Sequence, residues 1–117
     1  MGTNYYVART KATVERPTHI GKASAGWLFL FQTQNEIWHD PPIVWNTYEQ
    51  VKEWLRKNVV ESGEYAIVDE YDCIVTYDEF CERVNWRQND EHCLSNKDNF
   101  VYARNVDGYR FSDEEFS

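Results

Sequence analysis

The chain has 117 residues, which is room for a single compact domain, 1–117, built around one core. Hydrophobic residues at 42% and aromatic residues at 16% exclude a disordered chain, and the longest apolar run, 27–31, is far below the ~18 residues of a membrane span. With a net charge of −8 the chain lacks the basic surface of a nucleic-acid binder, and anionic membranes would repel it. We therefore expect neither nucleic acid nor a membrane as a partner.

The first part of the chain is expected to form strands. Residues 4–9 (NYYVAR) are aromatic and β-branched, which favours a strand, and the polar stretch 10–18 reads as a loop. The densest apolar segment, 20–32, is typical of a central strand covered on both faces. A short strand at 43–45 follows the Asp-Pro-Pro sequence.

The most regular segment, TYEQVKEWLRKNVV, predicts a helix. Thr47 and Gln50 have the spacing of a capping box, in which the two side chains bond to backbone N–H groups at the helix start. Apolar residues recur at three- and four-residue spacing and form one stripe, namely Tyr48, Val51, Trp54, Leu55 and Val59.

The second half predicts a strand at 65–68, a turn, and a strand at 73–75. Thr76 and Glu79 form a second capping box that opens a short helix, whereas 87–98 reads as irregular. Residues 100–111 indicate a hairpin around Asp107-Gly108. Together these elements predict an α+β fold with two helices and a small mixed or antiparallel sheet of about five or six short strands.

The segment HIGKAS raises the question of a phosphate site. A phosphate-binding loop needs a glycine five residues before its Gly-Lys pair, and position 16 is arginine instead. A different anion or nucleotide site, built from His19, Lys22 and Ser24, stays open. The alternative is a strand edge with exposed polar residues.

Metal binding and catalysis find little support in the sequence. The cysteines and histidines lack paired zinc-site spacing, so we expect no metal and no cofactor; these residues are His19, His39, His92, Cys73, Cys81 and Cys93. Cys73 and Cys81 are expected to be small core residues. No nucleophile, base and orienting group stand together, so we do not expect an enzyme.

Charge and aromatic content point to a protein partner. Residues 1–60 carry a balance of +2 and residues 61–117 one of −10, and such a field steers association with a basic partner or simply aids solubility. The acidic candidates for partner binding are Asp69, Glu70, Asp72, Asp78, Glu79 and Glu82. Among five tryptophans, Trp27 and Trp54 are expected in the core, and Trp38, Trp45 and Trp86 are the expected interface residues.

The segment HIGKASAGW at 19–27, followed by an aromatic strand, resembles a group of small uncharacterised proteins of tailed bacteriophages. The sequences IVDEY at 67–71, DEF at 78–80, DGYRF at 107–111 and the final Phe-Ser are similar to the same group. Many of its members place a Cys-x-x-Cys pair before the first segment, which implies zinc there. This chain has no cysteine before Cys73.

The resemblance implies a phage protein that acts in the host cytoplasm. Our leading hypothesis is an inhibitor that binds a host protein, such as a nucleic-acid-binding defence effector, and an anti-CRISPR protein is its concrete version. Two alternatives are a nucleotide or small-anion binding module that uses the His19–Ser24 segment, and a minor structural phage protein.

Overall fold

The computed structural model describes residues 2–10, 17–24, 29–38, 42–88, 104–106 and 108–113. In chain order its elements are β1 (Gly2–Arg9), β2 (Thr18–Ser24), β3 (Leu30–Gln32), β4 (Gln34–Glu36), β5 (Ile43–Trp45), α1 (Tyr48–Leu55), the π-helical continuation η1 (Arg56–Glu61), β6 (Tyr65–Asp69), β7 (Ile74–Val75), α2 (Tyr77–Gln88), β8 (Arg104–Val106) and β9 (Tyr109–Ser112).

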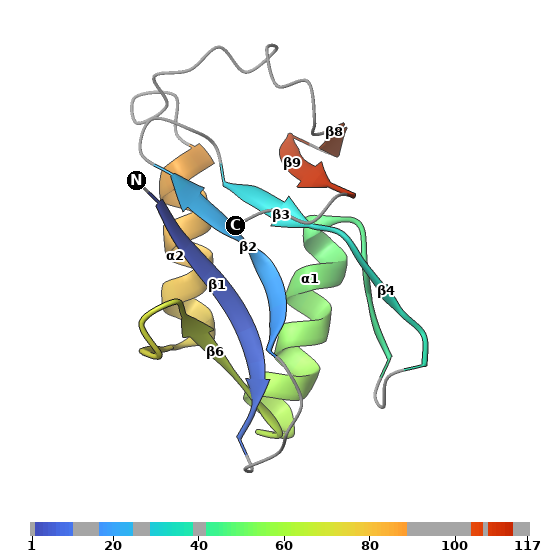
Figure 1. Cartoon of the computed structure of the whole chain (residues 1–117), viewed down its shortest axis with the longest axis vertical. Helices are drawn as coiled ribbons and strands as arrows, with labels where there is room; N and C mark the ends of the chain where they lie inside the picture. The colour runs from blue at the N-terminus through green and yellow to red at the C-terminus, as the bar shows by residue number, and fades with distance from the viewer. Residues whose placement is uncertain are drawn as a thin grey trace.

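One seven-stranded sheet, in the order β7-β6-β1-β2-β3-β9-β8, forms the centre of the fold, and β4 and β5 form a separate ribbon at its side (Figure 1). All neighbours in the large sheet are antiparallel except β3 and β9, which are parallel. The α+β class with a mixed sheet is therefore confirmed. Several strands have only two or three residues, too few for a periodic signal, so the described residues contain more strands than the sequence suggested.

Both helices lie behind the same face of the sheet (Figure 1). Alternate strand residues, such as Tyr5 and Val7 of β1, point into the core that the helices cover. The Tyr5 ring meets Phe80 of α2 edge-on at 5.7 Å, and Phe31 of β3 stacks on Phe111 of β9 at 4.9 Å. Aromatic rings thus connect the sheet to its helical layer.

The apolar run at 20–32 is two strands instead of one. β2 and β3 run antiparallel, with Gly21 opposite Phe31, while 25–28 lie outside the described residues. The expected cover on both faces is also wrong for the described elements, because both helices lie on one face of the sheet (Figure 1). Pairing the two halves of the run buries Ile20 and Phe31 as fully as a single central strand would, so composition could not separate the two arrangements.

Both expected helix starts are confirmed. The Thr47 hydroxyl accepts from the Gln50 N–H at 3.1 Å, and the Thr76 hydroxyl accepts from the Glu79 N–H at 3.1 Å. The predicted stripe of α1 is buried except for the partly exposed Val59. α2 extends to Gln88, two residues into the segment expected to be irregular.

The β1–β2 pair contains a bulge. Tyr5 lies opposite Gly21 and Tyr6 lies opposite His19, so Ile20 has no counterpart in β1. A Cβ atom at Gly21 would lie 2.4 Å from the Leu30 carbonyl oxygen and 2.5 Å from Cε1 of Phe29. The glycine is therefore needed for the close approach of β3, and it belongs neither to a turn nor to a phosphate-binding loop.

Tyr48 is buried where α1 meets α2 and β9. Its ring lies 5.3 Å from that of Phe31 and 4.3 Å from that of Tyr109. Burial, and then a hydrogen bond with the half-buried Cys81, raise the pKa of the Tyr48 phenol well above its usual range. The ionised phenolate is therefore strongly disfavoured in the folded protein.

Replacing Gly21 by alanine should destabilise the fold by about 1–3 kcal/mol, because the added methyl group meets backbone that cannot move freely. Chemical unfolding in urea would measure it. Gly63→Asn is the control, since Gly63 has φ +67° with open space around it, and asparagine tolerates that conformation. Equal stability of Gly21→Ala and the wild type would contradict the bulge packing.

Stability should fall as the pH rises above about 10, because an unfolded tyrosine ionises there and the folded Tyr48 does not. Tyr48 should contribute a loss of about 1.4 kcal/mol per pH unit in that range. Tyr48→Phe should flatten the profile measured by urea unfolding between pH 8 and 11.5, whereas Tyr71→Phe, at an exposed site, should not. Parallel profiles for the wild type and Tyr48→Phe would show the prediction to be wrong.

Candidate protein-binding surface and polar sheet face

All six acidic candidates lie on the β6–β7 hairpin and the following helix, and two of them stabilise the hairpin. Asp69 accepts the backbone N–H groups of Tyr71 and Cys73 at 2.8 and 3.0 Å. Glu70 accepts the backbone N–H of Asn4 at 2.8 Å and so extends the contact between β6 and β1. These two carboxylates act mainly within the fold. The same turn holds Cys73 at the surface, so its expected place in the core is wrong.

Glu79 also has partners within the chain. Besides its place in the helix cap, its carboxylate lies 3.9 Å from the guanidinium of Arg83. Arg83 in turn donates to the Tyr5 hydroxyl at 3.0 Å and lies over the Tyr5 ring at 5.8 Å. This Glu79–Arg83–Tyr5 contact fastens α2 to β1.

The remaining acidic candidates, Asp72, Asp78 and Glu82, are exposed. Within the part of the chain that the structure describes, none of them forms an ion pair. Asp78 and Glu82 are four residues apart on α2, which places their side chains next to each other on the helix surface.

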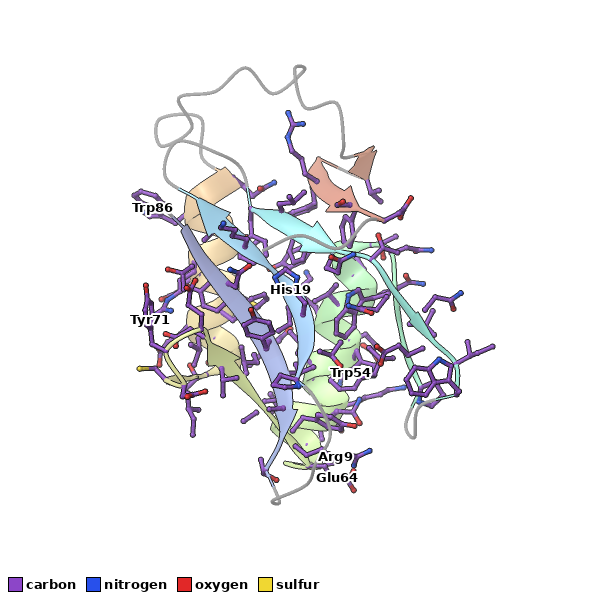
Figure 2. The ribbon with its side chains drawn as sticks, in the orientation of Figure 1. Arg9, His19, Trp54, Glu64, Tyr71 and Trp86 are labelled. Atoms are coloured by element: carbon purple, nitrogen blue, oxygen red, sulfur yellow. The ribbon has the colours of Figure 1, made fainter. Side chains whose placement is uncertain are left out.

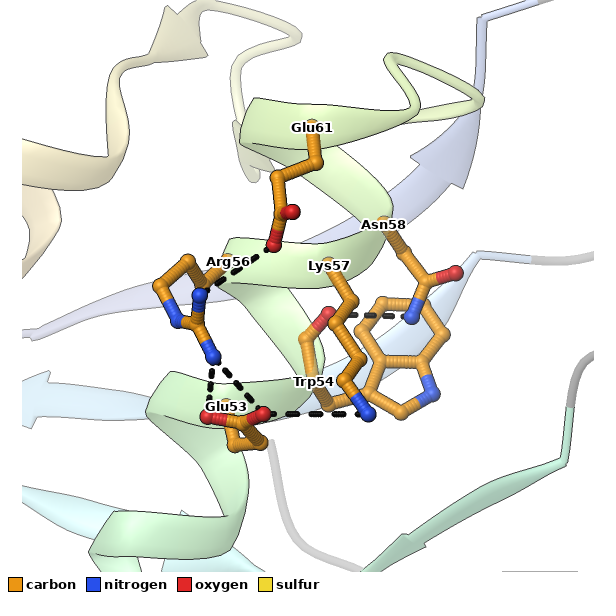
Figure 3. A network of polar contacts seen from close by, with 6 residues as sticks. All are labelled: Glu53, Trp54, Arg56, Lys57, Asn58 and Glu61. Atoms are coloured by element: carbon orange, nitrogen blue, oxygen red, sulfur yellow. Dashed lines mark hydrogen bonds and ion pairs between the residues drawn. The ribbon is translucent and has the colours of Figure 1, made fainter.

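The surface of α1 and η1 is different, because its charges neutralise one another (Figure 3). Glu53 binds the Arg56 guanidinium with both oxygens at 2.7 Å and lies 3.7 Å from Lys57, and Glu61 meets Arg56 at 3.3 Å. The hydrogen bond from Arg56 lowers the pKa of the Glu53 carboxyl. Of these two described surfaces, the one on the hairpin and α2 is therefore the one with unbalanced negative charge.

Exposed apolar side chains lie on the same hairpin and helix as these exposed carboxylates. Tyr71 is 67% exposed, Ile74 73% and Trp86 49%. Tyr71 and Trp86 both point outward on the same side of the molecule in Figure 2. Trp86 continues the row of Asp78 and Glu82 by another four residues. We call the set Tyr71, Asp72, Ile74, Asp78, Glu82 and Trp86 the acidic-aromatic surface.

Of the three tryptophans expected at an interface, Trp38 and Trp86 are exposed and Trp45 is not. Trp45 is fully buried, donates its indole N–H to the Gln32 carbonyl at 2.7 Å and packs edge-on against Trp54. A backbone acceptor satisfies its polar atom, so burial carries no penalty. Trp38 is 76% exposed at the end of the β4–β5 ribbon, outside the acidic-aromatic surface. Trp27 lies outside the described residues.

Sequence reasoning missed Tyr71 and Ile74. Their exposure follows from the shortness of β7, the edge strand of the sheet, which leaves one side of the hairpin uncovered by described elements. An aromatic residue in a turn and an isoleucine in the expected strand were the available signals.

His19 and Lys22 share the sheet face opposite the helices. Tyr6 and Asn4 are alternate residues of β1 and lie opposite His19 and Lys22, so the bulge brings both basic side chains to one face despite their three-residue spacing. The Tyr6 ring lies 5.2 Å from that of His19. Ser24 ends β2, and its side chain is outside the described set.

A polar relay crosses this face from β6 to β2. Asn4 Nδ2 faces Glu70 at 3.5 Å, which leaves Asn4 Oδ1 directed at Nε2 of His19, 2.9 Å away. An amide oxygen only accepts, so Nε2 of His19 must carry the proton. Glu70 therefore sets the tautomer of His19 through Asn4.

The histidines at 39 and 92 and the cysteine at 93 lie outside the described residues, so the structure does not test the expectation that the chain binds no metal. The residues that are described contain no group of three His, Cys, Asp or Glu side chains able to hold a metal ion. In the same part of the chain no helix has the length and apolar character needed to cross a membrane.

No protein-family model matches the chain, and no curated protein or solved structure is significantly similar to it.

Wild-type protein should show a single Nε2–H tautomer of His19 in ¹⁵N NMR spectra. Asn4→Ala removes the acceptor, so the tautomers should mix and the fold should lose about 1–3 kcal/mol. Glu70→Gln is the control, because its amide oxygen still accepts from Asn4 and should preserve the tautomer. An Nδ1–H tautomer in the wild type would overturn the relay.

Proposed function

We propose that this chain is a phage-encoded inhibitor that binds a host protein through its acidic-aromatic surface and blocks it by occlusion, without chemistry of its own. An anti-CRISPR or another anti-defence protein is the concrete form. The observation that carries the proposal is the combination of exposed carboxylates with Tyr71, Ile74 and Trp86 on one hairpin and helix.

The two kinds of side chain have complementary roles in such binding. Unpaired carboxylates steer a basic partner toward the surface and raise the association rate. Exposed aromatic side chains supply the buried anchors that give an interface most of its affinity. The basic nucleic-acid channel of a defence effector presents the matching charge, and an acidic protein seated there would exclude the nucleic acid.

A nucleotide or small-anion binding module is the second candidate. The bulge in β2 favours it, because His19 and Lys22 come to one face of the sheet beside the Tyr6 ring. Glu70 lies at the same face and opposes an anion, so this function ranks second.

A tagged pull-down from host lysate tests the inhibitor. The wild type should capture a stoichiometric host protein at 50 mM salt and lose it at 500 mM, because exposed charges are screened at about 4 Å and beyond under the higher salt. The triple variant Asp72→Asn, Asp78→Asn, Glu82→Gln should fail to capture the host protein at either salt concentration. Capture should also correlate with inhibition of the partner's nucleic-acid binding.

The matched control is Glu49→Gln, Glu53→Gln, Glu61→Gln, which changes the net charge equally on α1 and η1. It should keep the partner. Equal loss in both triple variants would mean that only total charge matters and would refute a defined surface. A bait without any partner at either salt concentration would refute the inhibitor and favour the anion-binding module.

A further inference from the structure

The outer side of α2 presents a carboxylate and an indole side by side. Glu82 and Trp86 are four residues apart, and both are exposed, while Phe80 and Val84 face the core. On a helix this spacing brings two side chains to about 5–6 Å between Cβ atoms. Asp78 adds a second carboxylate one turn earlier in the same row.

The protein already holds an arginine with the same two kinds of group. Arg83 lies between the Glu79 carboxylate at 3.9 Å and the Tyr5 ring, whose centroid is 5.8 Å away. A planar guanidinium pairs with a carboxylate through its edge and stacks on an aromatic ring through its face, so one side chain uses both groups. A lysine ammonium has no such plane.

We propose that Glu82 and Trp86 form a recognition site for an arginine side chain of the protein partner. The guanidinium binds the Glu82 carboxylate and stacks on the exposed part of the Trp86 indole. Asp78 attracts a second basic residue of the same segment. The occupant is therefore a protein segment with arginine, and the charge of the α2 row is complementary to it. This inference rests on the proposed function, because it names what the acidic-aromatic surface binds.

Two blocked pentapeptides, one of five arginines and one of five lysines, test the preference at equal length and charge. Titration followed by the indole N–H resonances in NMR should show tighter binding of the arginine peptide by about two- to five-fold, the range expected for one exposed cation–π contact. The Trp86 resonance should shift most. Trp86→Leu should abolish the preference and leave weak, salt-sensitive binding of both peptides.

Glu82→Gln should weaken binding of both peptides. Trp38→Leu is the matched control, since Trp38 is also exposed but lies on the β4–β5 ribbon, and it should keep the preference. Equal binding of the two peptides by the wild type, or a preference that survives in Trp86→Leu, would overturn the inference. If the pull-down still captures a host protein when the peptides show either of these results, the proposed inhibitor function is retained and only the arginine site is refuted. If the pull-down captures no host protein but the arginine preference is intact, only the inhibitor function is refuted.

Discussion

A continuous set of ring contacts centred on Phe29 and Phe31 connects strands β1, β3 and β9 to both helices. Phe29 meets Tyr5 of β1 at 5.9 Å and Phe80 of α2 at 5.6 Å, and it contacts Phe31 at 4.6 Å. Phe31 in turn contacts Phe111 of β9 and Tyr48 of α1. Because Phe80 is fixed in this core, the opposite side of α2 must face outward. The orientation of the acidic-aromatic surface is therefore a consequence of how the core packs.

The two helices use their charged residues differently. On α1 and η1 each described cation lies within ion-pair distance of a carboxylate, so the surface is nearly neutral at short range. Exposed pairs of this kind add little stability, and their effect is mainly to cancel the local field. On α2 only Glu79 has such a partner among the described side chains, and Arg83 is already engaged with Tyr5. Among the described residues, carboxylates without an ion pair therefore lie on the same helix as the exposed Trp86.

The sequence predicted the features that depend on local spacing. The stripe of α1, the threonine caps of both helices and the strand at 65–68 follow from residues close together in sequence, and the structure has them. Features that depend on distant partners were not accessible. Trp45 is buried because the Gln32 carbonyl accepts its N–H, and Cys73 is exposed because Asp69 holds it in a turn. The bulge that brings His19 and Lys22 together has no signature beyond an ordinary glycine.

The parallel pairing of β3 with β9 has a consequence for how the chain folds. Leu30 lies beside Arg110 and Phe31 beside Phe111, so strands about eighty residues apart in sequence must meet before the sheet is complete. Contacts of such long range slow folding, since the ends of a long loop have to be brought together first. During synthesis the edge of β3 cannot pair with β9 until residue 112 has left the ribosome. Until then the aromatic core stays open on one side, and the nascent chain has its greatest tendency to aggregate.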